Sequence, residues 1–359
     1  MDGDNIVQPS ATVAKPKVEL HVHLEGAVRA TTVWELSKKR GVPVPGRNAE
    51  ELAKAINDIE MGDLHKFLET FKIFLPSFIA DRAAIRRVAY ELCEDKWQEG
   101  VAYLEMRLSP HLMGNLSSLA LYRTAVQDTL SAREVVASVA EGIQEAQRAF
   151  PIRARIILIA LKNQPAWATE CLQLCKEFYP MTVAMDIAGQ ENLPLHSEII
   201  SAFQEAERCG IHRTVHAGEG GPASNVKEAI EVLKAERIGH GYRVLDDETI
   251  YQMVKDRGIH LEVCPTSSIY TGACDPDFTK HPCVRFHQDK VSYSLSTDDP
   301  LVFRTTINDE FQIAEKYFGL TAEQAAQVTL NAAYASFLPA EEKKELIQEL
   351  KAAHNLNTD

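Results

Sequence analysis

Histidines and carboxylates recur in this chain at the ends of short apolar segments. His21 and His23 are one residue apart, so in a strand both imidazoles point to the same side. His216 stands in the segment RTVHAGE and is followed on a loop by Glu219, and His240 stands in RIGHGYR. Imidazoles brought together in this way are ready metal ligands, and a carboxylate beside them can transfer protons.

Two adjacent carboxylates, Asp298 and Asp299, follow a further apolar segment and precede Pro300. Taken singly, Asp before Pro is typical of a helix N-cap, and one histidine is typical of a hydrogen-bonded core residue. Burying all these titratable groups together is costly unless they are paired or bind a metal. Three histidines and one aspartate suit Zn²⁺ with a position left for water, although ligand type alone leaves Fe²⁺ and Co²⁺ as alternatives. Such an ion lowers the pKa of bound water from about 15.7 towards about 7, which favours hydrolysis.

Eight short segments rich in β-branched and apolar residues must position these side chains. Strands are predicted at residues 18–24, 101–108, 155–161, 182–187, 213–216, 237–239, 260–263 and 292–296, and the last helices at 308–320, 322–337 and 341–354. Regular alternation of strands with amphipathic segments predicts an α/β fold, a (β/α)8 barrel. The named groups then follow strands one, five, six and eight and surround one mouth. An open doubly wound sheet, the alternative, requires a glycine-rich phosphate turn after the first strand, and none is present there.

Residues 26–100, between the first two strands, are more than one helix needs. An apolar stripe at helical spacing lies within them, and it indicates either a core-facing helix or a lid over the barrel mouth. The stripe is formed by Leu64, Phe67, Leu68 and Phe71. Residues 1–16 are predicted to be an N-terminal arm, and residues 17–359 a single catalytic domain with extra helices after the first strand and at the C-terminus.

The composition is that of an ordinary globular protein, with 45% hydrophobic and 25% charged residues. A net charge of −13 opposes binding to nucleic acid and to anionic membranes. No apolar stretch approaches the ~20 residues of a membrane span, and no secretory signal pattern is visible, so we expect a cytoplasmic protein. The seven scattered cysteines indicate reduced thiols rather than a metal site built from cysteines.

The motifs HVHLEG, RTVHAGE, RIGHGYR, EVCPTSS and SLSTDDPLVF, in this order, resemble the adenosine deaminase family of metal-dependent amidohydrolases. The segments HKFLETF, GVAYLEMRLSPHL, MDIAG and NAAYASFLP extend the resemblance from about residue 17 to residue 351. It implies zinc-dependent hydrolytic deamination of adenosine and 2′-deoxyadenosine to inosine and 2′-deoxyinosine plus ammonia, in purine catabolism or salvage. It also implies one Zn²⁺ per chain and a purine nucleoside as the small-molecule partner, and it says nothing of protein partners.

The resemblance further implies a role for each matching residue around the metal. The zinc ligands would be His21, His23, His216 and Asp298. Glu219 would give a proton to purine N1 and so make C6 electrophilic. His240 would orient the attacking hydroxide, take its proton or stabilise its charge.

Other matching residues would bind the substrate. The resemblance implies that Asp299 shares a proton with purine N7, that the Gly189 N–H reaches N3, and that Glu25 bonds a ribose hydroxyl. The stripe formed by Leu64, Phe67, Leu68 and Phe71 resembles the apolar cover that the family places on its pocket.

The sequence departs from the family pattern at a few positions. Glu25 is longer than the Asp of the animal enzymes and is similar to the Glu of adenine deaminases of the same family, while Gln190, Thr266 and Ser296 replace an acidic residue, an aromatic residue and Asn. Deamination of adenine or of N6-methyl-AMP is therefore an alternative, as is another mononuclear amidohydrolase reaction. A carboxylate at the ribose end would repel a phosphate, which favours a nucleoside or a base. A purely binding role is the remaining alternative.

Overall fold

The computed structural model describes residues 15–58, 64–115 and 129–356. Of the predicted N-terminal arm, only Lys15 and Pro16 belong to the described residues. Eight parallel strands follow one another around the centre of the molecule in sequence order. They are β1 (Lys17–His23), β2 (Val101–Leu108), β3 (Arg153–Leu161), β4 (Thr182–Ala188), β5 (His212–Ala217), β6 (Arg237–His240), β7 (His260–Val263) and β8 (Tyr293–Leu295). Each predicted strand is present, with its ends within two residues of the predicted ones.

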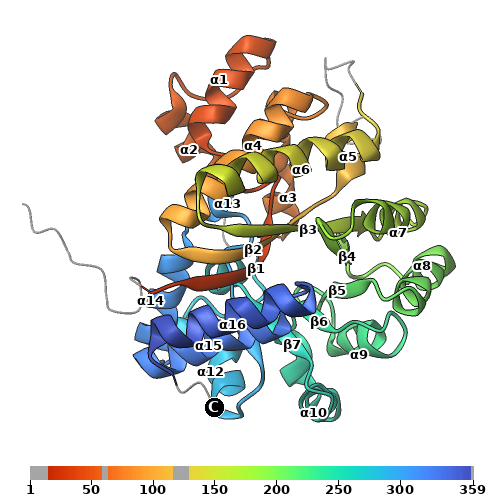
Figure 1. Cartoon of the computed structure of the whole chain (residues 1–359), viewed down its shortest axis with the longest axis vertical. Coiled ribbons are helices and arrows are strands. Elements are labelled where there is room, and N and C mark those ends of the chain that lie inside the picture. Colours follow the sequence, from red (N-terminus) through yellow and green to blue (C-terminus); the bar gives the residue numbers. More distant parts are fainter. Residues whose placement is uncertain (1–14, 59–63, 116–128, 357–359) are drawn as a thin grey trace, which may run out of the picture.

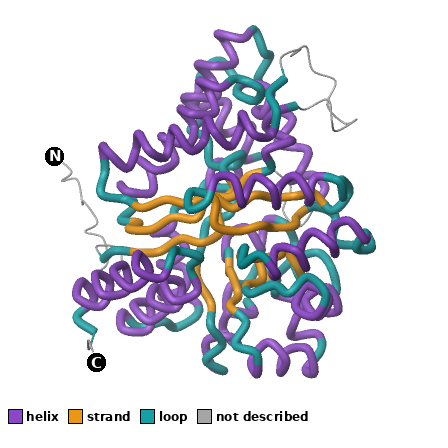
Figure 2. The backbone as a smooth tube through the Cα atoms, turned by 45° about the vertical axis from the view of Figure 1, so that its right-hand side comes forward, coloured by secondary structure: helices purple, strands orange, loops and turns teal. Residues whose placement is uncertain are grey.

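The first and last strands close the sheet on itself. A parallel bridge joins Val22 of β1 to Asp298, just beyond β8. The His23 N–H donates to the Asp298 carbonyl at 2.8 Å, and the Asp298 N–H donates to the His21 carbonyl at 3.0 Å. The predicted (β/α)8 barrel is therefore confirmed, with its helices outside the strands as Figure 1 and Figure 2 show.

The helices of the first part of the barrel include the predicted extra ones between β1 and β2 (Figure 1). These are α1 (Ala30–Arg40), α2 (Ala49–Asn57), α3 (Leu64–Phe74), the short helix Leu75–Ser77 and α4 (Arg82–Gln98). Next come α5 (Pro110–Gly114), α6 (Ala132–Ala149), α7 (Trp167–Phe178) and α8 (Ser197–Arg208). Side chains cap the N-termini of several of these helices. Ser131 and Glu134, for example, form a capping box at α6.

The second part of the barrel continues the same alternation. It contains α9 (Ala223–Glu231), the short helix Tyr242–Asp246, α10 (Glu248–Asp256), α11 (Pro265–Tyr270), the short helix Phe278–Lys280 and α12 (Pro282–Gln288). After β8 come α13 (Pro300–Phe303), α14 (Ile307–Tyr317), α15 (Ala322–Ala335) and α16 (Ala340–His354). The predicted C-terminal helices correspond to α14, α15 and α16.

The hydrophobic core lies between the strands and the surrounding helices. Val18 and Leu20 of β1, for example, are buried together with Leu330 of α15 and with Leu346 and Leu350 of α16. The C-terminal helices thus hold the strand that carries the first two histidines. None of the described helices combines the length and apolar character that crossing a bilayer would require.

Candidate active site

Four histidines meet where the strands end. His21 and His23 come from the end of β1, His216 from β5 and His240 from the last position of β6. The ring centroids of His21 lie 4.7 Å from those of both His216 and His240, and the rings of His23 and His216 are 5.2 Å apart. The structure therefore brings together side chains that the sequence separates by about two hundred residues.

Asp298, which lies just beyond β8, completes this group where β8 and β1 meet. One carboxylate oxygen, Oδ1, lies 3.3 Å from Nε2 of both His21 and His23. Asp298 and His240 have φ angles of 63° and 68°, in the left-handed region that side chains rarely adopt. Strained backbone of this kind is concentrated at functional sites, where the surrounding structure holds it in place.

The chemistry of the donors fits a divalent cation. Nε2 of His23 and Nε2 of His216 face each other at 3.2 Å. Burial outweighs the opposing charge of Asp298 and holds the pKa of His23 well below its usual value, so its ring is neutral and offers a lone pair. Ligand atoms of His21, His23 and His216 lie within 4.8 Å of one another. A cation between these nitrogens and the Asp298 carboxylate would satisfy all of them at once.

Cys264 lies in the same group, which the sequence did not predict. Its Sγ lies within 4.8 Å of ligand atoms of His21, His240 and Asp298. Burial, followed by the charge of Asp298, raises the pKa of its thiol well above the usual value. Because the thiolate is the form that binds metals, Cys264 is a poor ligand beside three imidazoles.

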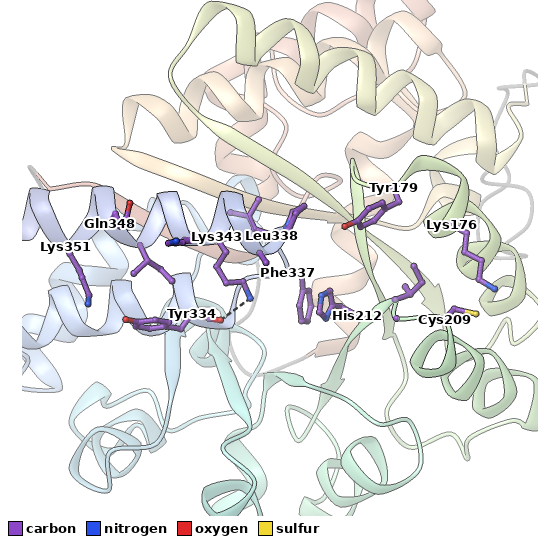
Figure 3. A pocket seen from close by; sticks show the side chains of 16 residues that line it. Lys176, Tyr179, Cys209, His212, Tyr334, Phe337, Leu338, Lys343, Gln348 and Lys351 are labelled. Atoms are coloured by element: carbon purple, nitrogen blue, oxygen red, sulfur yellow. Dashed lines mark hydrogen bonds between the residues drawn. The ribbon is translucent and has the colours of Figure 1, made fainter. Parts of the chain in front are cut away.

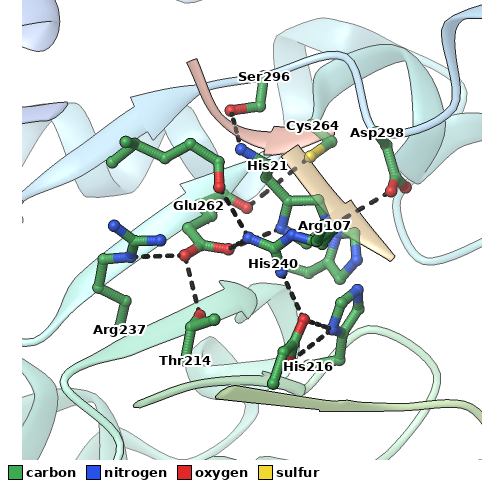
Figure 4. Close-up of polar contacts among 12 residues, drawn as sticks. His21, Arg107, Thr214, His216, Arg237, His240, Glu262, Cys264, Ser296 and Asp298 are labelled. Carbon is green, nitrogen blue, oxygen red and sulfur yellow. Dashed lines mark hydrogen bonds and ion pairs between the residues drawn. The ribbon is translucent and has the colours of Figure 1, made fainter. Parts of the chain in front are cut away.

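A buried carboxylate, Glu262 of β7, fixes the first histidine from behind (Figure 4). Its Oε2 lies 2.7 Å from Nδ1 of His21 and accepts from Arg107 at 2.6 Å, while its Oε1 accepts from Arg237 at 2.7 Å and Thr214 at 2.9 Å. Burial alone would favour the protonated acid, but the two guanidinium groups keep the pKa of Glu262 well below its usual value. The ionised carboxylate therefore sets the tautomer of His21 and leaves Nε2 facing the centre.

The other proposed ligands have similar supports. Nδ1 of His216 lies 3.0 Å from a carboxylate oxygen of Asp186, which also pairs with Arg107 at 2.7 Å. The Ser267 hydroxyl donates to Asp298 at 2.6 Å. Each of these contacts fixes a ring or a carboxylate in one orientation, as partners of metal ligands commonly do.

Glu219 lies on the loop after β5, with its carboxylate 3.6 Å from Nε2 of His240. Burial, then the negative charges of Asp298 and Glu191, raise its pKa well above the usual value. These surroundings therefore favour the protonated form of Glu219, which can act as an acid. Burial also holds the pKa of His240 well below its usual value, so its ring is neutral and can accept a proton.

One side chain, Glu191, holds the loop that carries Glu219. Its Oε2 accepts from the Gly218 N–H at 2.7 Å, and its Oε1 accepts from the N–H groups of Glu219 and Gly220, both at 2.9 Å. The side chain of Asn225 also donates to Glu191. A single carboxylate therefore binds three consecutive amides of the loop.

Two further carboxylates lie beside Asp298. Asp299 is buried, and burial followed by the charges of Asp298 and Glu25 raises its pKa well above the usual value. Glu25 accepts from the Ser109 N–H at 2.7 Å through Oε1, and burial raises its pKa to about 7. Within the described part of the chain, Asp299 Oδ1 and Glu25 Oε2 are buried without a hydrogen-bond partner, as expected of groups that bind a ligand.

Glycines allow the close approaches around these groups. A Cβ on Gly26 would lie 1.8 Å from Asp299 Oδ1, and a Cβ on Gly239 would lie 2.9 Å from the His21 ring. Gly189, the predicted contact to purine N3, follows β4 with φ of 100°, which only glycine adopts readily. Its predicted role stays a prediction.

The predicted apolar stripe lies on α3 beside the loop after β8. Phe67 is buried and stacks on Phe303 of α13 at 5.0 Å, and Phe71 meets Phe67 edge-on at 5.3 Å. Leu68 is 40% exposed because its side chain leaves the helix about 100° away from that of Phe67. The side chain of Leu64 lies outside the described residues. Of the described part of the stripe, the two aromatic rings are packed inwards and Leu68 is exposed.

Four residues that support the site were not predicted from the sequence: Glu191, Glu262, Asp186 and Arg107. A signal for three of them was present, since a charged residue interrupts each of the apolar strands VAYLEMRL, TVAMDIA and HLEV. A charge in the middle of a buried strand requires a buried partner. Nothing local distinguishes Glu191, because its partners are backbone amides of a distant loop.

The sequence model of the family described as Adenosine deaminase matches residues 16–353. The chain belongs to the adenosine deaminase family. It is 47% identical to the adenosine deaminase of Gallus gallus, covering 95% of this chain and 96% of the relative. It is 43% identical to that of Bos taurus, covering 95% of each, and 35% identical to that of Clostridium botulinum, covering 92% and 96%. As a member of the family, the chain is a hydrolase that acts on C–N bonds, and these relatives support hydrolytic deamination of adenosine.

Solved structures share the fold of this adenosine deaminase family member at 24% identity. An amidohydrolase from Burkholderia ambifaria, with bound Zn, matches with a TM-score of 0.83 over 98% of this chain and 95% of that one. The adenine deaminase of Arthrobacter aurescens gives 0.82 over 94% and 99%, and the Arabidopsis N6-mAMP deaminase 0.82 over 95% and 99%. At this identity the matches establish the barrel and leave the substrate open.

Proposed function

We propose that the chain deaminates adenosine and 2′-deoxyadenosine to inosine and 2′-deoxyinosine, in purine catabolism or salvage. The observation that supports this most directly is the pairing of a buried, protonated Glu219 with a neutral His240 beside a cluster of metal-binding side chains. An acid and a base held side by side are what addition of water to a purine ring requires.

One Zn²⁺ would be held by His21, His23, His216 and Asp298. The donor set of imidazoles and one carboxylate supports zinc, and the similar amidohydrolase from Burkholderia ambifaria contains bound Zn. When bound, the ion would lower the pKa of a water molecule and stabilise the charge that develops during its addition. Elemental analysis of the purified protein tests this assignment, and iron or cobalt at one equivalent with no zinc would replace it.

The side chains of the site divide the proton transfers between them. Glu219 gives its proton to purine N1, which makes C6 electrophilic. The neutral His240 ring takes a proton from the attacking water as its oxygen adds to C6. Asp299, whose raised pKa favours the protonated form, donates to N7, which has only a lone pair to offer. The proton held by His240 passes to the amino group, and the C6–N bond breaks so that ammonia leaves. As the C6 hydroxyl becomes the 6-oxo group, its proton returns to Glu219.

Glu25 would select the nucleoside. Its buried Oε2 is available to accept from a ribose hydroxyl, and its position beside Asp299 puts it close to the purine. A phosphate near these two carboxyl groups would meet negative charge or a desolvated acid without a cationic partner. We therefore expect adenosine to be the better substrate than adenine, AMP or N6-methyl-AMP.

Replacing Glu219 with Gln tests the mechanism. Gln keeps the shape but cannot transfer a proton, so kcat on adenosine should fall by about 10² to 10⁴ while zinc content stays at one per chain. Glu236→Gln, at the amino-terminal end of the barrel, is the matched control and should keep full activity. Undiminished turnover by Glu219→Gln would overturn the role given to this residue.

A steady-state comparison of substrates tests the specificity separately. The kcat/KM for adenosine should exceed that for adenine, AMP and N6-methyl-AMP, and shortening the side chain by Glu25→Asp should leave adenosine the preferred substrate. If adenine is turned over fastest, the base and not the nucleoside is the substrate.

A further inference from the structure

A second hollow lies at the end of the barrel opposite the candidate site. This groove, of about 1130 Å³, is bounded by the start of β5, the end of α7, the connection between α15 and α16, and one face of α16. Figure 3 shows Lys351 and Lys176 at opposite ends of its row of side chains, with Phe337 and His212 between them. The proposed reaction uses none of these residues.

The charge of the groove is opposite to that of the chain. Four lysines line it, and no Asp or Glu is among the lining residues of the described chain. In the whole sequence, by contrast, 51 Asp and Glu residues outnumber 38 Lys and Arg residues. The lysines are Lys176, Lys343, Lys344 and Lys351. Two acidic residues of α16 are paired elsewhere, Glu342 with Arg155 and Glu349 with Arg153. Lys176 pairs with Glu205 at 3.6 Å, so the three lysines of α16 give the groove a local positive potential.

Aromatic side chains give the groove an apolar interior. Tyr179 is 59% exposed and Tyr334 51% exposed, and both line the groove. Large aromatic side chains left open to solvent are enriched where proteins bind partners or ligands. Aromatic faces between cations favour a ligand that combines a flat apolar body with negative charge.

The floor of the groove is already fixed in the structure. Phe337 stacks on His212 with ring centroids 4.5 Å apart and planes inclined by 10°, and the guanidinium of Arg237 lies 3.8 Å from the Phe337 ring. The Phe337 N–H donates to the buried carboxylate of Glu105 at 2.6 Å. A ligand would therefore meet a preorganised surface and lose little free energy in ordering it.

We propose that this groove binds organic anions with an aromatic body. The lysines supply the charge, since His212 already pairs with Glu236 at 2.8 Å. Lys343 and Lys351 both line the groove from α16, eight residues apart, so an anionic group can be held on the α16 side of the apolar floor. The volume exceeds the roughly 300–1,000 Å³ of ordinary small-molecule sites, which leaves room for a ligand of several rings.

The test uses the full-length, metal-loaded protein and the fluorescent aromatic sulfonate 8-anilinonaphthalene-1-sulfonate. We expect saturable binding of one molecule per chain, weakened by sodium chloride and unaffected by saturating inosine. Lys343→Glu and Lys351→Glu should each raise Kd by about tenfold, the value of one charge-assisted contact. Lys344→Glu, at an exposed position, is a second variant in case either of these fails to fold. Lys316→Glu, also exposed and on α14, is the matched control and should leave Kd unchanged.

Four results would overturn the proposal. One is the absence of saturable binding, and another is displacement of the probe by inosine, which would assign it to the active site. The third is the same Kd in the folded groove variants as in the control. Binding of a short peptide of alternating glutamate and leucine, with no binding of the sulfonate, would also overturn it and would indicate an acidic segment of a partner protein.

Discussion

Replacing Glu191 with alanine is expected to impair catalysis although Glu191 is neither a proposed metal ligand nor a proposed substrate contact. The substitution removes the acceptor for three consecutive loop amides. The N–H groups of Gly218 and Glu219 are on buried residues, whereas Gly220 is exposed and can bond water instead. A buried donor left unsatisfied costs about 1–3 kcal/mol, so the folded loop loses about 2–6 kcal/mol relative to alternative arrangements.

That loss is large enough to release Glu219 from its place beside His240. Displacement of a catalytic group by about 1 Å costs about 10² in rate, so kcat on adenosine should fall by about a hundredfold or more. The assay is the loss of absorbance as adenosine becomes inosine, with thermal unfolding of each variant measured in parallel. Glu198→Ala, an exposed glutamate on α8, is the control and should leave both values unchanged.

Glu191→Gln separates geometry from charge. Its single amide oxygen can keep only one of the two donor pairs, either Glu219 with Gly220 or Gly218 with Asn225, so an intermediate rate is expected. Because the charge of Glu191 contributes to raising the pKa of Glu219, the basic limb of the pH–rate profile should also move to lower pH. If Glu191→Ala keeps kcat within twofold of the wild type, the loop does not depend on this carboxylate and the reasoning fails.

Further predictions concern the buried network and the metal. Glu262→Ala should destabilise the fold by about 3–5 kcal/mol, because Arg107 and Arg237 lose their shared partner, and should weaken metal binding by about 10–100-fold. Chelation should abolish activity and lower the unfolding temperature, with both restored by Zn²⁺, since an ion at a thousandfold excess over Kd contributes about 4 kcal/mol. Burial raises the pKa of Glu310 to about 7 from 4.5, so the folded chain holds a proton that the unfolded chain releases in this interval. The unfolding free energy should therefore fall as pH rises through it, by at most about 1.4 kcal/mol per pH unit, and Glu310→Gln should flatten this slope.

Each of these predictions has a result that contradicts it. Wild-type metal affinity in Glu262→Ala would show that His21 is oriented without its carboxylate partner. Activity that survives complete removal of metal would exclude a role for the ion in turnover. An equal slope of stability with pH in Glu310→Gln and the wild type would mean that Glu310 does not titrate in that interval.

The positions of the reactive side chains could be predicted because barrel topology converts strand ends into neighbours. His21, His216 and His240 each close a short apolar run, and eight such runs are enough to imply one shared mouth. Cys264 shows the limit of this reasoning, since a thiol next to the proposed ligands follows from the path of the chain after β7 and not from a metal-binding spacing.

The remaining features depend on long-range packing that no local pattern encodes. Glu191 and the loop it holds are separated by the whole of α8 and β5, and their contact follows from how two barrel loops meet. The left-handed backbone of Asp298 is imposed by the closing seam, because Asp is only moderately tolerant of that conformation. The groove between α7 and α16 likewise joins segments more than 150 residues apart.

The backbone of Asp298 joins the end of the last strand to the first strand by hydrogen bonds. Its amide and carbonyl bond to His21 and His23, and its side chain faces the same two residues. An ion bound there would stabilise the closure of the barrel between β8 and β1. Loss of the ion and opening of the barrel at this junction would therefore occur together. Amide protons along β1 and β8 should then exchange with solvent at a rate set by ion occupancy. Those of β3 and β4, on the opposite side of the barrel, should exchange more slowly and independently of the ion.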